Sequence, residues 1–151
     1  IIDTTYMAPK QLKERVSTLF SDDDNQSFRV TCLSFGFKYG PATEADLLFD
    51  VRCLTNPFYV ESLRKKTGLD KEVSDFVLSK PEAQNLKDKL FDLIDFLIPL
   101  YEKEGKSQLV IAIGCTGGKH RSVTFAEAIY KYLISKNRRV SVTHRDIEKK
   151  F

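Results

Sequence analysis

The chain has 151 residues, of which 42% are hydrophobic, and carries a formal net charge of +3 at pH 7. This length suits one domain with a substantial core, and no apolar run is long enough to cross a membrane as a helix. The cysteines (Cys32, Cys53 and Cys115) are odd in number and lie in or beside apolar runs. That pattern favours reduced thiols in the cytoplasm over a disulfide framework, and the Cys/His spacing predicts no metal site.

The first segment resembles the end of a longer protein. A short strand is expected at Ile1–Thr5, and the sequence IIDTTYMAPK lacks the charged start and apolar core of a signal peptide. From Lys10 to Phe20 the apolar residues follow helical spacing, which predicts an amphipathic helix. An acidic loop with Asp22 to Asp24 comes next.

Strands and helices then alternate. Phe28 to Phe35 and Leu47 to Val51 are β-rich apolar runs, whereas the spacing of apolar residues predicts a short helix at Glu72 to Leu78 and a long one at Pro81 to Lys103. A third apolar run, Leu109 to Ile113, follows the long helix.

The C-terminal part contains a further helix with Val123, Ala126 and Ile129 on one face, then a strand at Arg139–Thr143 and a short basic helix from about Arg145. This alternation predicts an α/β fold: a mostly parallel sheet of about four to five strands with helices on both faces.

Residues 113–123, IGCTGGKHRSV, carry the strongest functional signal. They join a buried strand to a helix start, where free N–H groups and the helix dipole attract anions. Gly117 and Gly118 permit close backbone approach, and Lys119, His120 and Arg121 add basic groups. The segment therefore predicts a phosphate-binding glycine loop at a strand-to-helix turn.

Other polar residues follow the predicted strands. In parallel sheets ligands bind beyond the carboxyl ends of the strands, which places Lys38, Asp50, Arg52 and Asn56 near the glycine loop. Each has a structural alternative: Asp50 and Arg52 would also suit an ion pair, and Asn56 is a common turn residue. His144 follows the last predicted strand and is a weaker candidate.

The glycine loop also permits an enzymatic interpretation. Cys115, Arg121 and Ser122 match the C-x5-R-S pattern of cysteine phosphatases, with Cys115 as nucleophile and Arg121 as phosphate clamp. Asp50 or Asp146 would have to serve as general acid. Alternatively, Cys115 is a small residue packed beneath a loop that only binds. The Walker A spacing is absent, which argues against ATP hydrolysis by this segment.

Four motifs in order, SFGFKYG (34–40), FDVRCLTNP (49–57), TGLD (67–70) and IGCTGGKHRSV (113–123), closely resemble the C-terminal domain of the RapZ family. These are RNase adapter proteins, also described as P-loop nucleotide-binding proteins. The resemblance implies that residues 1–25 are a remnant or linker from a missing N-terminal domain, which would bind ATP or GTP. Residues 26–151 would be the C-terminal domain, with no cofactor of its own.

The resemblance implies a regulatory adaptor rather than an enzyme, with the phosphatase as the alternative. The domain would bind glucosamine-6-phosphate and a small regulatory RNA, present RNA to an endoribonuclease such as RNase E, and form a homo-oligomer without a membrane partner. By matching motif, the phosphosugar residues are Lys38, Asp50, Arg52, Asn56, Cys115, Thr116, Gly117, Gly118, Lys119, His120, Arg121 and Ser122. The expected RNA contacts form a basic tail: Arg138, Arg139, Arg145, Lys149 and Lys150. Phe58 stands where the family often has histidine.

Overall fold

A computed structural model describes residues 28–149, so the expected strand at Ile1–Thr5 and helix from Lys10 to Phe20 lie outside the described residues, as does Lys150. The elements in chain order are β1 (Arg29–Gly36), η2 (Phe37–Tyr39), β2 (Leu47–Asp50), η3 (Pro57–Tyr59), α2 (Lys71–Leu78), α3 (Pro81–Lys103), β3 (Gln108–Cys115), α4 (Arg121–Ser135) and β4 (Arg139–His144).

The four strands form one sheet in the order β2-β3-β1-β4, and every neighbouring pair is parallel. The α/β fold predicted from the alternating pattern is therefore confirmed. Because Gly36 pairs with Cys115 and Asp50 with Gly114, the carboxyl ends of three strands meet at the same edge. That edge is where the glycine loop enters α4.

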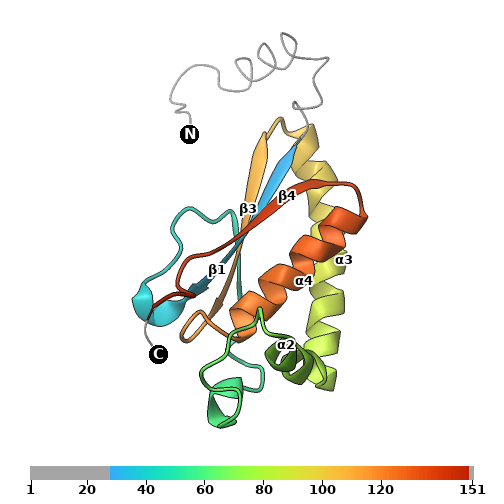
Figure 1. The fold of residues 1–151 in the computed structure, drawn as a ribbon. Coiled ribbons are helices and arrows are strands. Elements are labelled where there is room, and N and C mark those ends of the chain that lie inside the picture. The colour runs from blue at the N-terminus through green and yellow to red at the C-terminus, as the bar shows by residue number, and fades with distance from the viewer. Residues whose placement is uncertain (1–27, 150–151) are drawn as a thin grey trace.

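The α-helices of the described residues, α2, α3 and α4, pack on one face of the sheet (Figure 1). Their apolar residues join the inward-facing strand residues in one core, in which Val30, Ile111, Ile94 and Phe125 are buried. Helix α4 lies directly against the sheet, and α2 and α3 pack beside it.

The opposite face differs from the expectation of helices on both faces. Among the described residues a smaller cluster of Leu33, Phe35 and Ala112 is covered by Phe37 and Ala42, which belong to the segment after β1. The rings of Phe35 and Phe37 meet edge to face at 4.8 Å. Glycine 114 leaves the space for them, because a Cβ there would lie 2.5 Å from the Phe35 ring. A loop with aromatic side chains therefore suffices to cover this face.

The predicted helix bounds agree closely with the structure, since α3 spans Pro81–Lys103 and α2 begins one residue before the prediction. The basic helix expected from about Arg145 is wrong, because residues 145–149 form turns. The Lys119 Nζ donates to the carbonyl oxygens of Asp146, Ile147 and Lys149, and so ties this segment to the glycine loop. Within residues 28–149, no helix combines the length and apolar character needed to cross a membrane.

Candidate functional site

A cavity of about 210 Å³ lies at the carboxyl edge of the sheet, beside the N-terminus of α4. It collects residues from η2, from η3 with the residue before it, and from the glycine loop with the flanking ends of β3 and α4. Its lining residues are Lys38, Asn56, Phe58, Tyr59, Cys115, Thr116, Gly117, Lys119, His120 and Arg121. Eight of the twelve residues assigned to phosphosugar binding from the sequence thus share one cavity.

The glycine loop packs backbone to backbone against the end of β1. Gly118 has φ +76°, and a Cβ on it would lie 2.6 Å from the Gly36 nitrogen. A Cβ on Gly36 would in turn lie 2.4 Å from the Gly117 carbonyl carbon, whereas one on Gly117 would meet nothing within 4 Å. Glycine is therefore required at 118 and 36 for close packing and conformation, while Gly117 borders open space in the cavity.

Arg121 is the first residue of α4, and its guanidinium reaches into the cavity wall. The residue is only 4% exposed. Its Nη1 donates to the carbonyl oxygens of Arg52 (2.8 Å) and Leu54 (3.0 Å), and its Nη2 lies 3.5 Å from the Thr116 hydroxyl. The buried Nε has no hydrogen-bond partner among the residues that the structure describes. Buried donors are almost always satisfied, so this N–H is suited to an acceptor in the cavity, such as a water molecule or an anion.

Lys119 joins the cavity to the turns after β4. Its Nζ lies 2.9 Å from the Ile147 carbonyl oxygen and 3.3 Å from that of Asp146. Burial lowers the pKa of Lys119, and the positive charge of Lys38 lowers it further. The positive charge of Lys38 therefore disfavours the charged form of Lys119 at this cavity.

His120 connects the glycine loop to the segment after η3. Its Nε2 lies 3.2 Å from the Arg64 carbonyl oxygen, which can only accept, so this nitrogen carries the proton. Burial lowers the pKa of His120, although backbone carbonyls partly oppose the shift. The imidazole is therefore neutral at pH 7 and acts as a polar group of fixed orientation. The Gly68 N–H donates to the Lys119 carbonyl at 2.8 Å and further fastens the two segments.

The cavity lining has an excess of positive charge. Lys38, Lys119 and Arg121 line it, whereas no carboxylate is among the lining residues that the structure describes. Three cations in a small cavity repel one another, and an anion among them would remove that repulsion while gaining charge-assisted hydrogen bonds. The arrangement suits a phosphate group.

Four predicted binding residues lie outside the cavity lining. Asp50 and Arg52 form a bidentate ion pair at 2.7 Å, and the guanidinium stacks 4.0 Å above the Phe37 ring. The hydrogen bond from Arg52 lowers the pKa of Asp50. The two side chains therefore stabilise the end of β2 through their ion pair and the contact with Phe37. The Arg52 carbonyl oxygen also accepts a hydrogen bond from Arg121. The remaining two, Gly118 and Ser122, pack behind the loop.

His144 is also placed away from the cavity lining. Its Nδ1 lies 2.7 Å from the Ser34 hydroxyl and its Nε2 lies 2.8 Å from Glu127. These contacts join β1, β4 and α4 and account for a histidine at the end of β4.

The structure offers little support for acid catalysis beside the predicted nucleophile. Cys115 is buried, and its thiol lies 3.2 Å from the Ser122 hydroxyl. Neither candidate acid lines the cavity. Burial would raise the pKa of Asp146, but hydrogen bonds from Arg145 and the Gly36 N–H outweigh it and hold that pKa below its usual value. A general acid at neutral pH needs the opposite shift.

Two aromatic residues at the cavity mouth were not among the predicted binding residues. Phe58 is 40% exposed and Tyr59 is 78% exposed. Both follow Asn56-Pro57, and the Asn56 side chain accepts the Phe58 N–H at 3.0 Å to start η3. The Asn-Pro turn signal was visible in the sequence, but the direction in which the rings point depends on the tertiary structure.

The basic tail does not form one cluster. Arg138 precedes β4 and pairs with Glu102 of α3 at 3.0 Å. Arg145 and Lys149 lie at the other end of β4, and both pair with Asp146. Arg145 also donates to the carbonyl oxygens of residues 40 and 41 and so secures the segment after β1. Much of this positive charge thus has a structural use.

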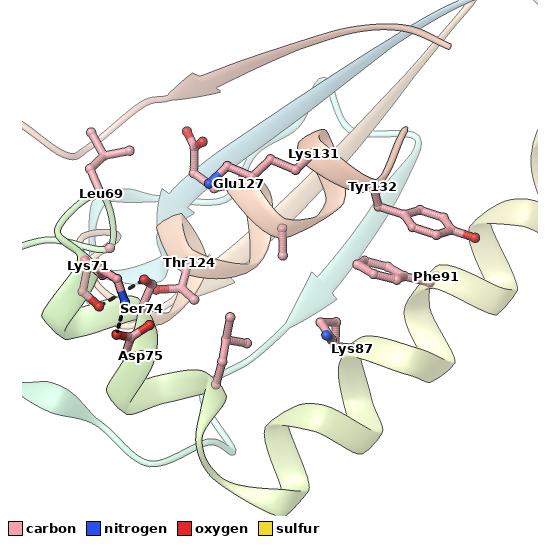
Figure 2. Close-up of a pocket in the computed structure, with 13 residues that line it drawn as sticks. Leu69, Lys71, Ser74, Asp75, Lys87, Phe91, Thr124, Glu127, Lys131 and Tyr132 are labelled. Carbon is pink, nitrogen blue, oxygen red and sulfur yellow. Dashed lines mark hydrogen bonds and ion pairs between the residues drawn. The ribbon is translucent and has the colours of Figure 1, made fainter. Parts of the chain in front are cut away.

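A larger groove of about 730 Å³ lies between α2, α3 and α4 (Figure 2). Its charges are largely paired within the protein, as for Lys71 and Asp75 at 2.7 Å, and Phe91 stacks on Tyr132 at 4.1 Å. The described residues contain no cluster of histidine, cysteine and carboxylate groups suited to a metal ion. The smaller cavity is therefore the better candidate site.

The chain is similar to known proteins over nearly its whole length. A family model described as RapZ C-terminal domain matches residues 28–148. Curated relatives include a nucleotide-binding protein of Lysinibacillus sphaericus, 55% identical over 99% of this chain and 50% of its own length. Nucleotide-binding proteins of Bacillus cytotoxicus and of Bacillus subtilis (YvcJ) are each 53% identical over 99% of this chain, covering 51% and 50% of their lengths. The chain thus spans about half the length of these relatives.

Proposed function

The chain belongs to the family of RapZ C-terminal domains, and we propose that it is a regulatory adaptor domain whose cavity binds a phosphorylated amino sugar similar to glucosamine-6-phosphate. In this proposal the phosphate lies at the glycine loop and the sugar ring extends towards η3. The domain holds its ligand and carries out no reaction on it.

The buried Arg121 Nε without a protein partner is the observation that carries this proposal. It lies in a cavity that also contains Lys38 and Lys119 and no carboxylate among its lining residues. A phosphate monoester supplies the missing acceptor and neutralises the local excess of positive charge. Each charge-assisted hydrogen bond contributes about 1.5–3 kcal/mol.

The proposal extends to RNA, to an endoribonuclease such as RNase E as partner, and to a homo-oligomer. Arg138, Arg139, Lys149 and Lys150 would contact RNA phosphates, and residues 1–25 would link the domain to an N-terminal nucleotide-binding half. Because Arg138 and Lys149 lie at opposite ends of β4, an RNA that contacts both must span the six residues of that strand, about 20 Å.

Calorimetry with a ligand series tests sugar-phosphate binding. Glucosamine-6-phosphate should bind at least tenfold more tightly than glucosamine, because the phosphate makes the charge-assisted contacts. Glucose-6-phosphate and inorganic phosphate separate the contribution of the amino group from that of the anion. Equal affinity for glucosamine and its phosphate would exclude the glycine loop as the binding element.

A pair of lysine variants locates the site. Lys38→Ala removes an exposed cavity cation and should weaken glucosamine-6-phosphate about fivefold to tenfold. Lys89→Ala removes an exposed lysine of α3 that does not line the cavity and serves as the matched control. Equal losses in both variants would indicate general electrostatic attraction instead of a defined site.

Salt dependence tests the RNA contact. Binding of a structured small RNA should weaken linearly on a log–log scale with salt. Alanine at Arg138, Arg139, Lys149 and Lys150 together should reduce that slope by up to about three units. An unchanged slope would move the RNA surface elsewhere.

The phosphatase alternative rests on the contact between the Cys115 thiol and the Ser122 hydroxyl in a C-x5-R-S loop. It predicts hydrolysis of para-nitrophenyl phosphate that Cys115→Ser abolishes. The adaptor proposal expects no turnover of phosphate esters, including phosphotyrosine peptides, across the pH range. Robust hydrolysis that depends on Cys115 would replace the adaptor by an enzyme.

A further inference from the structure

The mouth of the cavity carries a fixed aromatic rim formed by Phe58 and Tyr59. The two rings meet edge to face at 5.6 Å. The Arg64 guanidinium lies 5.0 Å from the Phe58 ring centre, and its Nε donates to the Phe58 carbonyl at 2.9 Å. One ring is thus held in place by a cation and a neighbouring ring, while Tyr59 remains 78% exposed. An exposed aromatic ring supported in this way is a stacking surface.

The size of the cavity limits what it can enclose. At about 210 Å³ it is smaller than the roughly 300–1,000 Å³ of pockets that enclose drug-sized ligands. A phosphate with one sugar ring fits this scale, whereas a larger ligand must extend through the mouth. Any group attached to the far side of the sugar therefore lies beside Tyr59, which lines the cavity.

Nucleoside 5′-phosphates share the phosphate and sugar arrangement of the proposed ligand. Glucosamine-6-phosphate carries its phosphate on a CH2 group attached to a sugar ring, and a nucleoside 5′-phosphate has the same connectivity. In the nucleotide, the anomeric carbon on the other side of the ring carries a planar base. With the phosphate at the glycine loop, that base would reach the aromatic rim.

We propose that the cavity and its aromatic rim bind the 5′-phosphorylated end of a single-stranded RNA, with the terminal phosphate at the glycine loop and the first base stacked on Tyr59. This inference rests on the proposed function, since it uses the same phosphate site. Stacking on an aromatic ring accepts any base, so recognition is of the chain end and not of a sequence.

The charges around the rim favour a nucleic-acid chain over a free nucleotide. Arg64 and Lys65 follow the rim and are exposed, and Lys38 is exposed at the cavity lining. Residues 58–66 contain three basic residues and one acid, Glu61. Lys66 pairs with Glu72 at 2.9 Å, so Arg64 and Lys65 are the cations better placed for the next phosphates of the chain. Basic groups beside exposed aromatic rings are the usual features of single-strand binding.

A thermodynamic cycle isolates the stacking step. Adenosine 5′-phosphate and ribose 5-phosphate differ only in the base, and the nucleotide should bind about 5- to 100-fold more tightly to the parent protein. Tyr59→Ala should reduce this ratio to about one, whereas Tyr59→Phe, which keeps the ring, should preserve it. Phe96→Ala is the matched control, because Phe96 is an aromatic residue 65% exposed on α3 outside the cavity lining.

Oligonucleotides test the chain end directly. An eight-nucleotide RNA with a 5′-phosphate should bind at least tenfold more tightly than the same RNA with a 5′-hydroxyl, measured by fluorescence anisotropy. It should also bind more tightly than adenosine 5′-phosphate, because Arg64 and Lys65 add contacts. Equal affinity for the two RNAs would overturn the inference, as would binding of the free nucleotide alone.

The same measurements separate this inference from the proposed function. If glucosamine-6-phosphate binds but neither the base nor the 5′-phosphate of RNA adds affinity, only the inference fails. If no phosphate monoester binds, the proposed function fails with it. A folded state in every variant is checked by thermal unfolding.

Discussion

The groove between α2, α3 and α4 and the cavity beside α4 differ in size and in charge. The groove is the larger of the two hollows, whereas the cavity has the greater excess of positive charge. The groove between α2, α3 and α4 is more than three times larger than the cavity beside α4, at about 730 Å³ against 210 Å³. Its lining carries both signs of charge, and Lys71 and Asp75 pair with each other. The cavity has cations without a lining carboxylate, and it has a buried N–H without a partner. Unsatisfied charge and hydrogen bonding indicate a ligand better than volume does.

The largest expected effect concerns Arg121, whose buried N–H distinguishes the cavity from the groove. Arg121→Ala removes the buried guanidinium and should reduce affinity for glucosamine-6-phosphate by about 10- to 100-fold in calorimetry. It should also lower the melting temperature, because the carbonyl oxygens of Arg52 and Leu54 lose their donor. Lys131→Ala in the groove is the control and should leave the affinity unchanged. A similar loss in both variants would remove the distinction between the hollows.

Matched aspartate variants compare how much a buried carboxylate behind the glycine loop and an exposed one in the groove contribute to stability. Asp146 is fully buried and accepts hydrogen bonds from the Gly36 N–H and from Arg145, so Asp146→Asn should reduce the free energy of unfolding by about 2–3 kcal/mol. Asp75→Asn breaks an exposed pair and should cost less than about 0.5 kcal/mol. Urea unfolding at pH 7 measures both. Equal costs would contradict the structural role of Asp146.

Adjacent glycines provide a sharper test of the cavity wall. Gly118→Ala forces a side chain into a backbone conformation with φ +76° and against the Gly36 nitrogen, and should cost about 2 kcal/mol. Gly117→Ala places its methyl in open space and should change the free energy of unfolding by less than about 0.5 kcal/mol. If denaturant midpoints shift equally, the close contact between the glycine loop and β1 is not present in solution.

The smallest expected effect is a pH dependence. Burial holds the pKa of His120 below its usual 6.5, so the unfolded chain takes up a proton at a higher pH than the folded protein does. The contribution of His120 to stability is therefore complete above pH 6.5 and is lost as the pH falls through the folded-state pKa. Melting temperatures between pH 7.5 and 5.5 should fall more steeply for the parent than for His120→Gln. Parallel curves would mean that His120 does not contribute.

Local patterns in the sequence predicted most of the secondary structure. Leucines at every third or fourth position predicted α3 with its observed bounds, and apolar runs predicted all four described strands. The segment after β4 was predicted as a short basic helix. Residues 145–149 form turns instead, and the Lys119 Nζ, from a segment far away in the chain, donates to the Ile147 carbonyl oxygen there.

The cavity was predictable as far as it depends on sheet topology. Residues that follow parallel strands meet at one edge, and this rule brought Lys38, Asn56 and the glycine loop together. The rule does not state which side chains turn towards one another. Asp50 and Arg52 satisfied each other, and Tyr59 was directed to the cavity mouth.

The sequence by itself determined the alternation of strands and helices, the glycine loop and the family, because these depend on residue types at short spacing. Only the tertiary structure decided which basic groups line the cavity. Lys119 and Arg121 have carbonyl partners from distant segments, whereas the Arg121 Nε has no partner within residues 28–149. Hydrogen-bond satisfaction depends on the three-dimensional position of every acceptor, which no local pattern contains.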